Sequence, residues 1–134
     1  MRSENCFSWI RTMERRRGMD IHRMIVTLKN HPDARRIGMI ASHLGVVRGT
    51  SRDGRPVEAV EVVYDRDRLR EILQETRALP GIVDVLAEVQ EGRLRVGDEI
   101  LAVAVAGDIR EHVFDALIRA VNRIKAEASR KKEY

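Results

Sequence analysis

The stretch EILAVAVA at residues 99–106 constrains the fold of this chain more than any other feature. Every residue after the glutamate is apolar, yet the stretch is far shorter than the roughly 20 residues that a membrane-spanning helix needs. Its small and β-branched side chains favour a strand. Because such a strand has no polar side to turn toward water, it is expected to be covered on both faces. The sequence therefore predicts a strand buried between other elements.

Two earlier segments have the apolar spacing of helices. The first is expected to begin near residue 21 and to end before Asn30. The second is expected to follow a capping aspartate, Asp65 or Asp67, and to stop at Pro80-Gly81. The residues of this second helix that are expected to face inward are Leu69, Ile72, Leu73 and Thr76.

Strands are expected around these helices. A buried strand is predicted at residues 38–49, and an Asp53-Gly54 hairpin turn is predicted to lead into a returning strand at 57–64. A further strand is predicted at 82–89, with turns at Glu91-Gly92 and Gly97-Asp98. The pattern indicates an α+β fold for residues 19–134, with a mixed or antiparallel sheet packed by two main helices.

The last segment, residues 107–134, predicts an amphipathic helix with cations on its apolar face. Asp108 and Glu111 have the spacing of a capping box. At about 100° per residue, Arg110 and Lys125 fall within the apolar stripe around Phe114, and Lys132 would rejoin that stripe if the helix continued. Either these cations border the core and pair with carboxylates, or they bind an anion. About 22 Å of helix separates Arg110 from Lys125, so one small ligand reaches both only if the helix bends or another subunit contributes.

Charge gathers at the two ends of the chain. Residues 1–18 carry +3 and residues 119–134 carry +4, so the body between them carries −3. An acidic body argues against nucleic-acid binding, and residues 1–18 are expected to form a disordered basic arm. Cys6 is the single cysteine, which excludes an internal disulfide and a cysteine-rich zinc site. With no secretory signal and no membrane segment visible in the sequence, a reducing, cytoplasmic setting is expected.

Most catalytic templates are absent from the sequence. It has no glycine-rich phosphate loop, no nucleophile elbow and no His-Glu-x-x-His, and its four histidines lack metal-ligand spacing. We therefore expect no metal and no resident cofactor. Arg48 is a further candidate cation, because it ends an apolar strand before a Gly-Thr-Ser loop. From pattern alone, the prediction is an anion-binding α+β domain.

Two segments carry a resemblance to a known family. GMIASHLGVVRG at 38–49 resembles the segment that opens the catalytic (large) subunit of molybdopterin synthase, with its Gly-x-Val-Arg ending. Residues 92–134 are similar to the second half of that family: Gly-x-Leu-x-Val-Gly-Asp, the apolar strand, an Arg and a Phe early in the helix, a Lys near its end, and a terminal Lys-Lys-Glu. The order and spacing agree over roughly residues 37–134.

The resemblance implies an α/β-hammerhead-like fold and a homodimer. It also implies docking of a ubiquitin-like sulfur-carrier small subunit, whose C-terminal thiocarboxylate gives sulfur to a cyclic pyranopterin monophosphate and forms the molybdopterin dithiolene. The essential lysine of the family corresponds to Lys125, and its second lysine to Lys132, or to Lys131 if one residue is lost. Its phosphate-binding arginines correspond to Arg48 and Arg110.

The chain departs from the family pattern at several positions. Ile109 replaces the histidine that precedes Arg110, and His43, an expected substrate-binding residue, replaces a phenylalanine. Gln90-Glu91 stands where a second His-Arg pair is expected. These changes leave two interpretations: a sulfurtransferase, or a divergent non-catalytic relative that binds a partner or a pterin.

Overall fold

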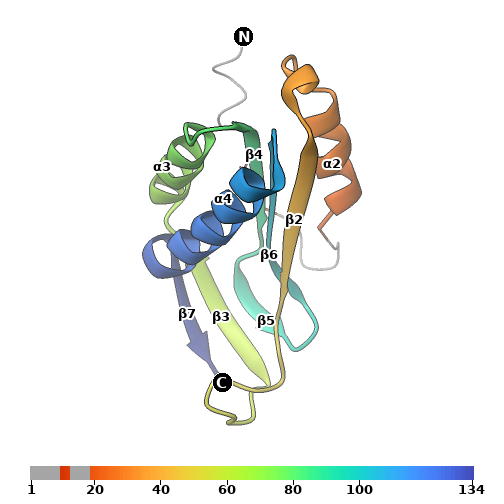
Figure 1. Cartoon of the computed structure of the whole chain (residues 1–134). Helices are drawn as coiled ribbons and strands as arrows, with labels where there is room; N and C mark the ends of the chain where they lie inside the picture. The colour runs from red at the N-terminus through yellow and green to blue at the C-terminus, as the bar shows by residue number, and fades with distance from the viewer. Residues whose placement is uncertain (1–9, 13–18) are drawn as a thin grey trace.

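The computed structural model describes residues 10–12 and 19–134 (Figure 1). In the described residues, strands β1 to β7 and helices α2 to α4 are interspersed along the chain, and a short 3₁₀ turn follows α2. Their bounds are β1 Ile10–Thr12, α2 Ile21–Lys29, β2 Met39–Val46, β3 Ala59–Tyr64, α3 Arg66–Arg77, β4 Ile82–Val89, β5 Gly92–Arg95, β6 Glu99–Gly107, α4 Arg110–Arg123 and β7 Ser129–Glu133.

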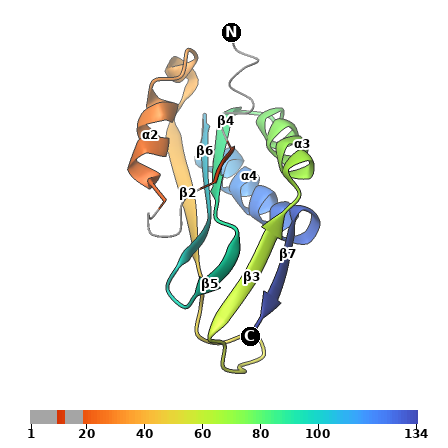
Figure 2. The ribbon, with the colours of Figure 1, turned by 180° about the vertical axis from the view of Figure 1, so that it is seen from behind.

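The strands form two sheets. One has four strands in the order β1-β4-β6-β2, and the other has three in the order β5-β3-β7. Only β1 and β4 pair in parallel; the other neighbouring strands are antiparallel. The view from behind shows the three-stranded sheet at the end of the molecule away from α2 (Figure 2). The prediction of an α+β fold with mixed and antiparallel sheets is confirmed.

Strand β6 lies between β4 and β2 and is buried from Leu101 to its end. Its larger side chains point into a core shared with α3 and α4, whereas its alanines pack in a second core with α2. Successive residues of a strand point to opposite faces, so each face of β6 has its own cover. The prediction that this strand is covered on both sides is therefore correct.

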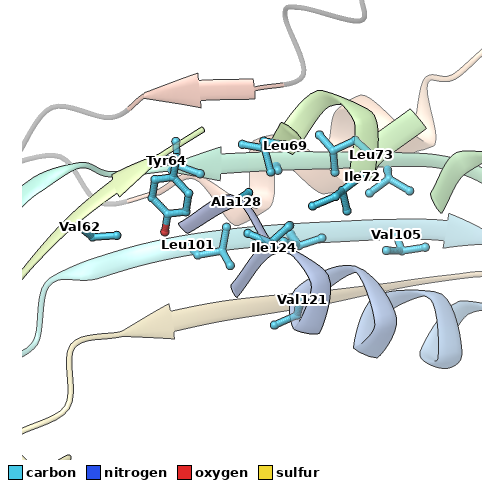
Figure 3. Close-up of a cluster of buried hydrophobic side chains, with 14 of the residues drawn as sticks. Val62, Tyr64, Leu69, Ile72, Leu73, Leu101, Val105, Val121, Ile124 and Ala128 are labelled. Carbon is cyan, nitrogen blue, oxygen red and sulfur yellow. The ribbon is translucent and has the colours of Figure 1, made fainter. Parts of the chain in front are cut away.

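Helix α3 forms where the sequence predicts it. The Asp65 carboxylate accepts a hydrogen bond from the Arg68 N–H at 3.0 Å, which satisfies one of the free donors of the first turn. The four residues expected to face inward are all buried. Figure 3 shows how side chains from α3 meet those from β3, β6 and the end of α4 in the larger core.

Strand β2 differs from its prediction, because it is an edge strand of its sheet and only partly buried. The Asp53-Gly54 turn is present, with Gly54 at a φ of +90°. The strands on either side nevertheless separate into different sheets, and beyond the named strands one bridge, Thr50 to Pro56, joins the two arms of the turn. The segment predicted as a hairpin, residues 47–58, is therefore a corner at which the chain passes from one sheet to the other. This corner leaves space between the two sheets.

The start of α4 also differs from its prediction. Ile109 is the N-cap residue, without a side-chain cap bond. The Asp108 carboxylate instead accepts from the Ile109 N–H at 2.7 Å and pairs with His112 Nδ1 at 2.7 Å. The predicted capping box with Glu111 is therefore wrong, since the aspartate lies one residue too early to serve as the cap.

The buried face of α4 is not the one centred on Phe114. The helix packs through Val113, Ala116, Ala120 and Val121, whereas Phe114 is 50% exposed and Ile118 60% exposed. Small alanines allow the helix to approach the sheet closely, so a stripe defined by the largest side chains points the wrong way. Arg110 and Lys125 consequently flank an exposed apolar stripe and do not lie on the buried face.

The chain leaves the α-helical path after Arg123. Residues Ile124–Ala128 form a π-helical turn, and β7 follows and pairs with β3. Lys132 therefore lies on a strand, so the condition under which it would rejoin the helix stripe, a helix that continues to residue 132, is not met. The sequence SRKKE has no alternation of apolar and polar residues that would predict a strand. Its polar composition is typical of an exposed edge strand.

Part of the predicted N-terminal arm can be placed. Residues 10–12 form β1 beside β4, and the rest of residues 1–18 lies outside the described residues. The prediction that this arm is disordered stays a prediction. No helix in the part of the chain described by the structure is long and apolar enough to cross a membrane.

Candidate active site

A cavity of about 1000 Å³ lies at the junction of the two sheets. The end of β2, the corner after it, β3, β6, the π-helical turn and β7 all contribute to its wall. The lining residues are Gly45, Val46, Val47, Arg48, Thr50, Arg52, Val60, Val62, Tyr64, Ile100, Leu101, Ile124, Lys125, Ser129, Lys131 and Glu133. Its apolar lining residues come mainly from β2, β3 and β6, and its charged groups come from the corner, the π-helical turn and β7.

Four cations line this cavity, and Glu133 is the one carboxylate among its lining residues. Arg48 and Arg52 come from the corner, Lys125 from the π-helical turn, and Lys131 from β7. Glu133 offsets part of this charge, since its Oε2 lies 3.9 Å from Lys131 Nζ. The surplus of positive charge suits the cavity to an anionic ligand.

Lys125 combines a cation with partial removal from water. The π-helical turn that carries it is a feature found frequently at functional sites, and the Ser129 hydroxyl donates to the Lys125 carbonyl at 3.1 Å. Burial lowers the pKa of the Lys125 ammonium, and the nearby charges of Lys131 and Arg52 lower that pKa further. A lowered pKa gives this lysine a larger neutral fraction than a free lysine, which is what proton transfer or nucleophilic chemistry requires.

The two arginines are held by the corner that carries them. Arg48 Nε donates to the Thr50 carbonyl at 2.9 Å, which orients its guanidinium within the corner. Arg52 lies in a turn closed by the Ser51 N–H donating to the Arg55 carbonyl at 2.8 Å. Sequence reasoning missed Arg52, because a turn arginine has no distinguishing pattern; its closeness in sequence to Arg48 was the available signal.

The structure distinguishes the two candidate lysines of β7. Lys131 pairs with Val62 and lines the cavity, whereas Lys132 pairs with Glu61 on the opposite face of the strand. Lys132 Nζ lies 5.2 Å from the centre of the Tyr134 ring, outside the cavity. Of the two correspondences that the sequence left open, the one with Lys131 is therefore the one that meets Lys125.

His43 lies on β2 behind the cavity wall. It shares a strand face with Met39 and Ala41, which pack against the core that contains α3 and α4. Its Nε2 is buried and has no hydrogen-bond partner among the described residues. Burial lowers the pKa of this imidazole, and the charge of Lys125 lowers it further, so His43 is predominantly neutral at pH 7.

Tyr64 closes the inner wall of the cavity. Its hydroxyl donates to the Ile100 carbonyl at 3.1 Å, and burial, followed by the charge of Glu91, raises the pKa of this phenol. The phenol therefore stays neutral and ties β3 to β6. We assign it a structural role in the wall.

Arg110 is the one predicted site residue that the structure places far from the others. It is exposed in the first turn of α4, at the opposite end of that helix from Lys125, and it does not line the cavity. Ile109 beside it is 48% exposed and offers no side-chain donor. Over the described part of the chain, the structure contains no group of three or more His, Cys, Asp or Glu side chains able to hold a metal ion.

Comparison with known proteins places the chain in a family. The model of the MoaE protein family matches residues 16–127. Molybdopterin cofactor biosynthesis protein E from Burkholderia multivorans ATCC 17616 is 27% identical, with a TM-score of 0.74 over 93% of this chain and 86% of that one. Molybdopterin synthase from Staphylococcus aureus is 25% identical, with a TM-score of 0.63 over 73% and 74%.

A more distant structure shares the fold alone. The complex of subunits 1 and 2 of molybdopterin-converting factor from Helicobacter pylori 26695 is 12% identical, with a TM-score of 0.67 over 93% of this chain and 84% of that one. None of the curated proteins matches the sequence. The family model covers the part of the cavity wall from β2 to Lys125 of the π-helical turn and ends before β7. The chain belongs to the MoaE protein family.

Proposed function

We propose that this protein is the catalytic large subunit of molybdopterin synthase. In this role it transfers sulfur from the thiocarboxylated C-terminus of a small carrier subunit to cyclic pyranopterin monophosphate, and each transfer leaves the carrier with a carboxylate. Membership of the MoaE protein family supports this role. The observation that carries the proposal is the meeting of Lys125 and Lys131 in one cavity with two arginines.

The cavity has the size and polarity for such a substrate. Its volume of about 1000 Å³ lies at the upper end of the range of roughly 300–1000 Å³ typical of small-molecule sites. Arg48 and Arg52 present planar guanidinium groups, which bind phosphate oxygens through paired hydrogen bonds. The apolar wall built by β3 and β6 gives the pterin ring a surface to pack against.

Lys125 is the residue that we assign to the chemistry. Its neutral amine can accept a proton from the reacting group, and its ammonium can return one to the leaving group. Lys131 keeps the pKa of Lys125 low by its charge and also faces the bound anion. The cavity thus provides a proton carrier, Lys125, and a neighbouring charge that lowers the pKa of this lysine.

A second copy of the chain is part of the proposal. Arg110, Phe114 and Ile118 follow one another at helical spacing on the exposed side of α4, so they form a stripe with a cation at one end. Packing of this stripe against another copy would cover its apolar residues. It would also bring Arg110 to a site that it cannot reach within its own chain.

A non-catalytic relative is the second candidate, and Ile109 favours it. The family pattern has a histidine beside Arg110, and isoleucine removes that hydrogen-bond donor. The experiment that separates the two candidates is incubation of the protein with the pyranopterin precursor and a thiocarboxylated carrier, followed by detection of the dithiolene product by mass spectrometry. Product formation supports the enzyme, whereas binding of the precursor without product supports the relative.

A further inference from the structure

The imidazole of His43 contains a buried nitrogen that the fold leaves without a partner. Its Nε2 has no hydrogen bond within the part of the chain that the structure describes. Leaving a buried polar atom unpaired costs about 1–3 kcal/mol, so such an atom in a native protein calls for an explanation. The atom lies beside the cavity and not deep in either core.

Gly45 places this nitrogen at the cavity wall. Gly45 lines the cavity, and a Cβ built on it would lie 3.2 Å from His43 Nε2 and 3.3 Å from a methyl carbon of Ile100. A side chain at position 45 would therefore crowd the imidazole. Nε2 thus lies next to a residue of the cavity lining, although His43 itself is not one of the lining residues.

The charged groups around His43 are almost all positive. Lys125 acts on it directly, and Arg48, Arg52 and Lys131 line the same cavity. Glu133 is the carboxylate of the lining, and it faces Lys131. On β6 the residue paired with His43 is Val103, which is apolar, and α2 packs on the other face of the sheet. Burial is the larger cause of the lowered pKa of His43 and the charge of Lys125 is the smaller one, and an anion beside Lys125 offsets the second of these.

We propose that His43 is an additional anion-binding residue of this site: when an anion binds beside Lys125, His43 takes up one proton from solvent and donates Nε2–H toward that anion. This inference rests on the proposed function, in which the anion is the phosphate of the substrate or the carboxylate of the carrier tail. The anion offsets the positive charge of Lys125, which adds to burial in keeping the imidazole neutral, and the new N–H gives the unpaired nitrogen a partner. Binding is thereby coupled to proton uptake.

The proposed role of His43 is specific to this chain, because His43 departs from the family motif. His43 stands where the family motif has phenylalanine, while Ile109 stands where the family has histidine. One imidazole is thus lost at the start of α4 and another is gained behind Gly45. The gained group lies in the same chain as Lys125, so it acts without a contribution from a second copy.

The test uses sulfate, whose charge is constant over the range in which histidine titrates, about pH 5 to 8. Sulfate affinity is measured by calorimetry across that range on the full chain, and the ring signals of His43 are followed by NMR. A rise of one unit in the pKa of His43 on binding corresponds to about tenfold tighter sulfate binding at the acid end than at the alkaline end. His43→Phe, which restores the family residue, is expected to keep the fold and to lose this His43-dependent part of the pH effect.

His22→Gln is the matched control, because His22 is exposed on α2, away from the cavity. Calorimetry in buffers of different ionisation enthalpy counts the protons that are taken up when sulfate binds. The wild type and this control should show the same pH dependence of sulfate affinity and the same proton uptake. Equal pH dependence in His43→Phe and the wild type would overturn the inference, as would absence of sulfate binding to the wild type. Because neither measurement requires turnover, a protein that binds sulfate in this way but forms no dithiolene would contradict the proposed function alone.

Discussion

Lys125 and Lys131 belong to different elements, a π-helical turn and an edge strand, yet they line one cavity, and the charge of Lys131 helps to lower the pKa of Lys125. Lys131 lies six positions after Lys125 in the chain, and a continuous helix would have turned the two lysines to different sides. The change from helix to strand after Ala128 brings them together. The site therefore depends on the end of α4 leaving the helical path.

The two neighbouring lysines of β7 provide a direct test of this geometry. Lys131→Ala is expected to lower kcat/KM for dithiolene formation by at least about tenfold, since a hydrogen bond to a charged group contributes roughly 1.5–3 kcal/mol. Lys132→Ala removes the same charge from the opposite face of the strand and should leave the kinetics close to wild type. Steady-state measurement of both variants checks this, and a larger loss in Lys132→Ala would reverse the assignment.

Arg52 should contribute to anion binding although no motif identified it. Arg52→Ala is expected to weaken binding of the pyranopterin precursor by roughly ten- to a hundredfold, through loss of a charge-assisted hydrogen bond. Arg55→Ala, on the same turn but paired with Asp53 and outside the cavity lining, is the control. Calorimetric titration of both variants decides the question, and unchanged affinity in Arg52→Ala would remove this residue from the site.

The exposed stripe on α4 should be the contact between two copies. Ile118→Asp is expected to convert a dimer into a monomer at tens of micromolar, because it places a charge within an apolar contact. Val26→Asp changes an exposed apolar residue of α2 and should leave the dimer intact. Light scattering with size-exclusion chromatography reports the mass. A wild-type protein that is already monomeric would refute the dimer.

The buried carboxylate of Asp84 should matter for stability and not for chemistry. It accepts from Arg77 Nε at 2.8 Å and from the Val85 N–H at 2.7 Å, and it lies 3.3 Å from His31 Nε2. Asp84→Ala is expected to lower the free energy of unfolding by about 3 kcal/mol, as for other broken buried pairs. Asp115→Ala, which breaks an exposed pair with Arg119, should cost less than about 1 kcal/mol. Urea denaturation measures both, and equal costs would contradict this role.

Regular, amphipathic elements could be predicted from the sequence. Helix α3 has an aspartate cap and an inward stripe of large side chains, so local signals and packing agree. Strand β6 is apolar throughout, which dictates burial on both faces. In α4 the same reasoning failed because alanines make the contact with the sheet, and small residues give a weak hydrophobic signal.

The candidate site was only partly predictable, because several of its residues depend on tertiary structure. Lys125 and Arg48 were found from their places in apolar segments and again through family motifs, whereas Arg52 comes from a corner whose course is set by the divergence of β2 and β3. The choice between Lys131 and Lys132 required the register of β7 against β3, which a polar edge strand does not reveal.

Lys125 carries the central claim, and single-turnover formation of the dithiolene by Lys125→Ala tests it most directly. The comparison is with Arg119→Ala, a cation on α4 that is paired with Asp115 at the surface. If Lys125 moves protons in the reaction, its removal should slow product formation by at least about a hundredfold, with unfolding curves unchanged and Arg119→Ala fully active. Equal rates in the two variants would contradict the account, because Lys125 would then be no more than a charged residue at the edge of the cavity.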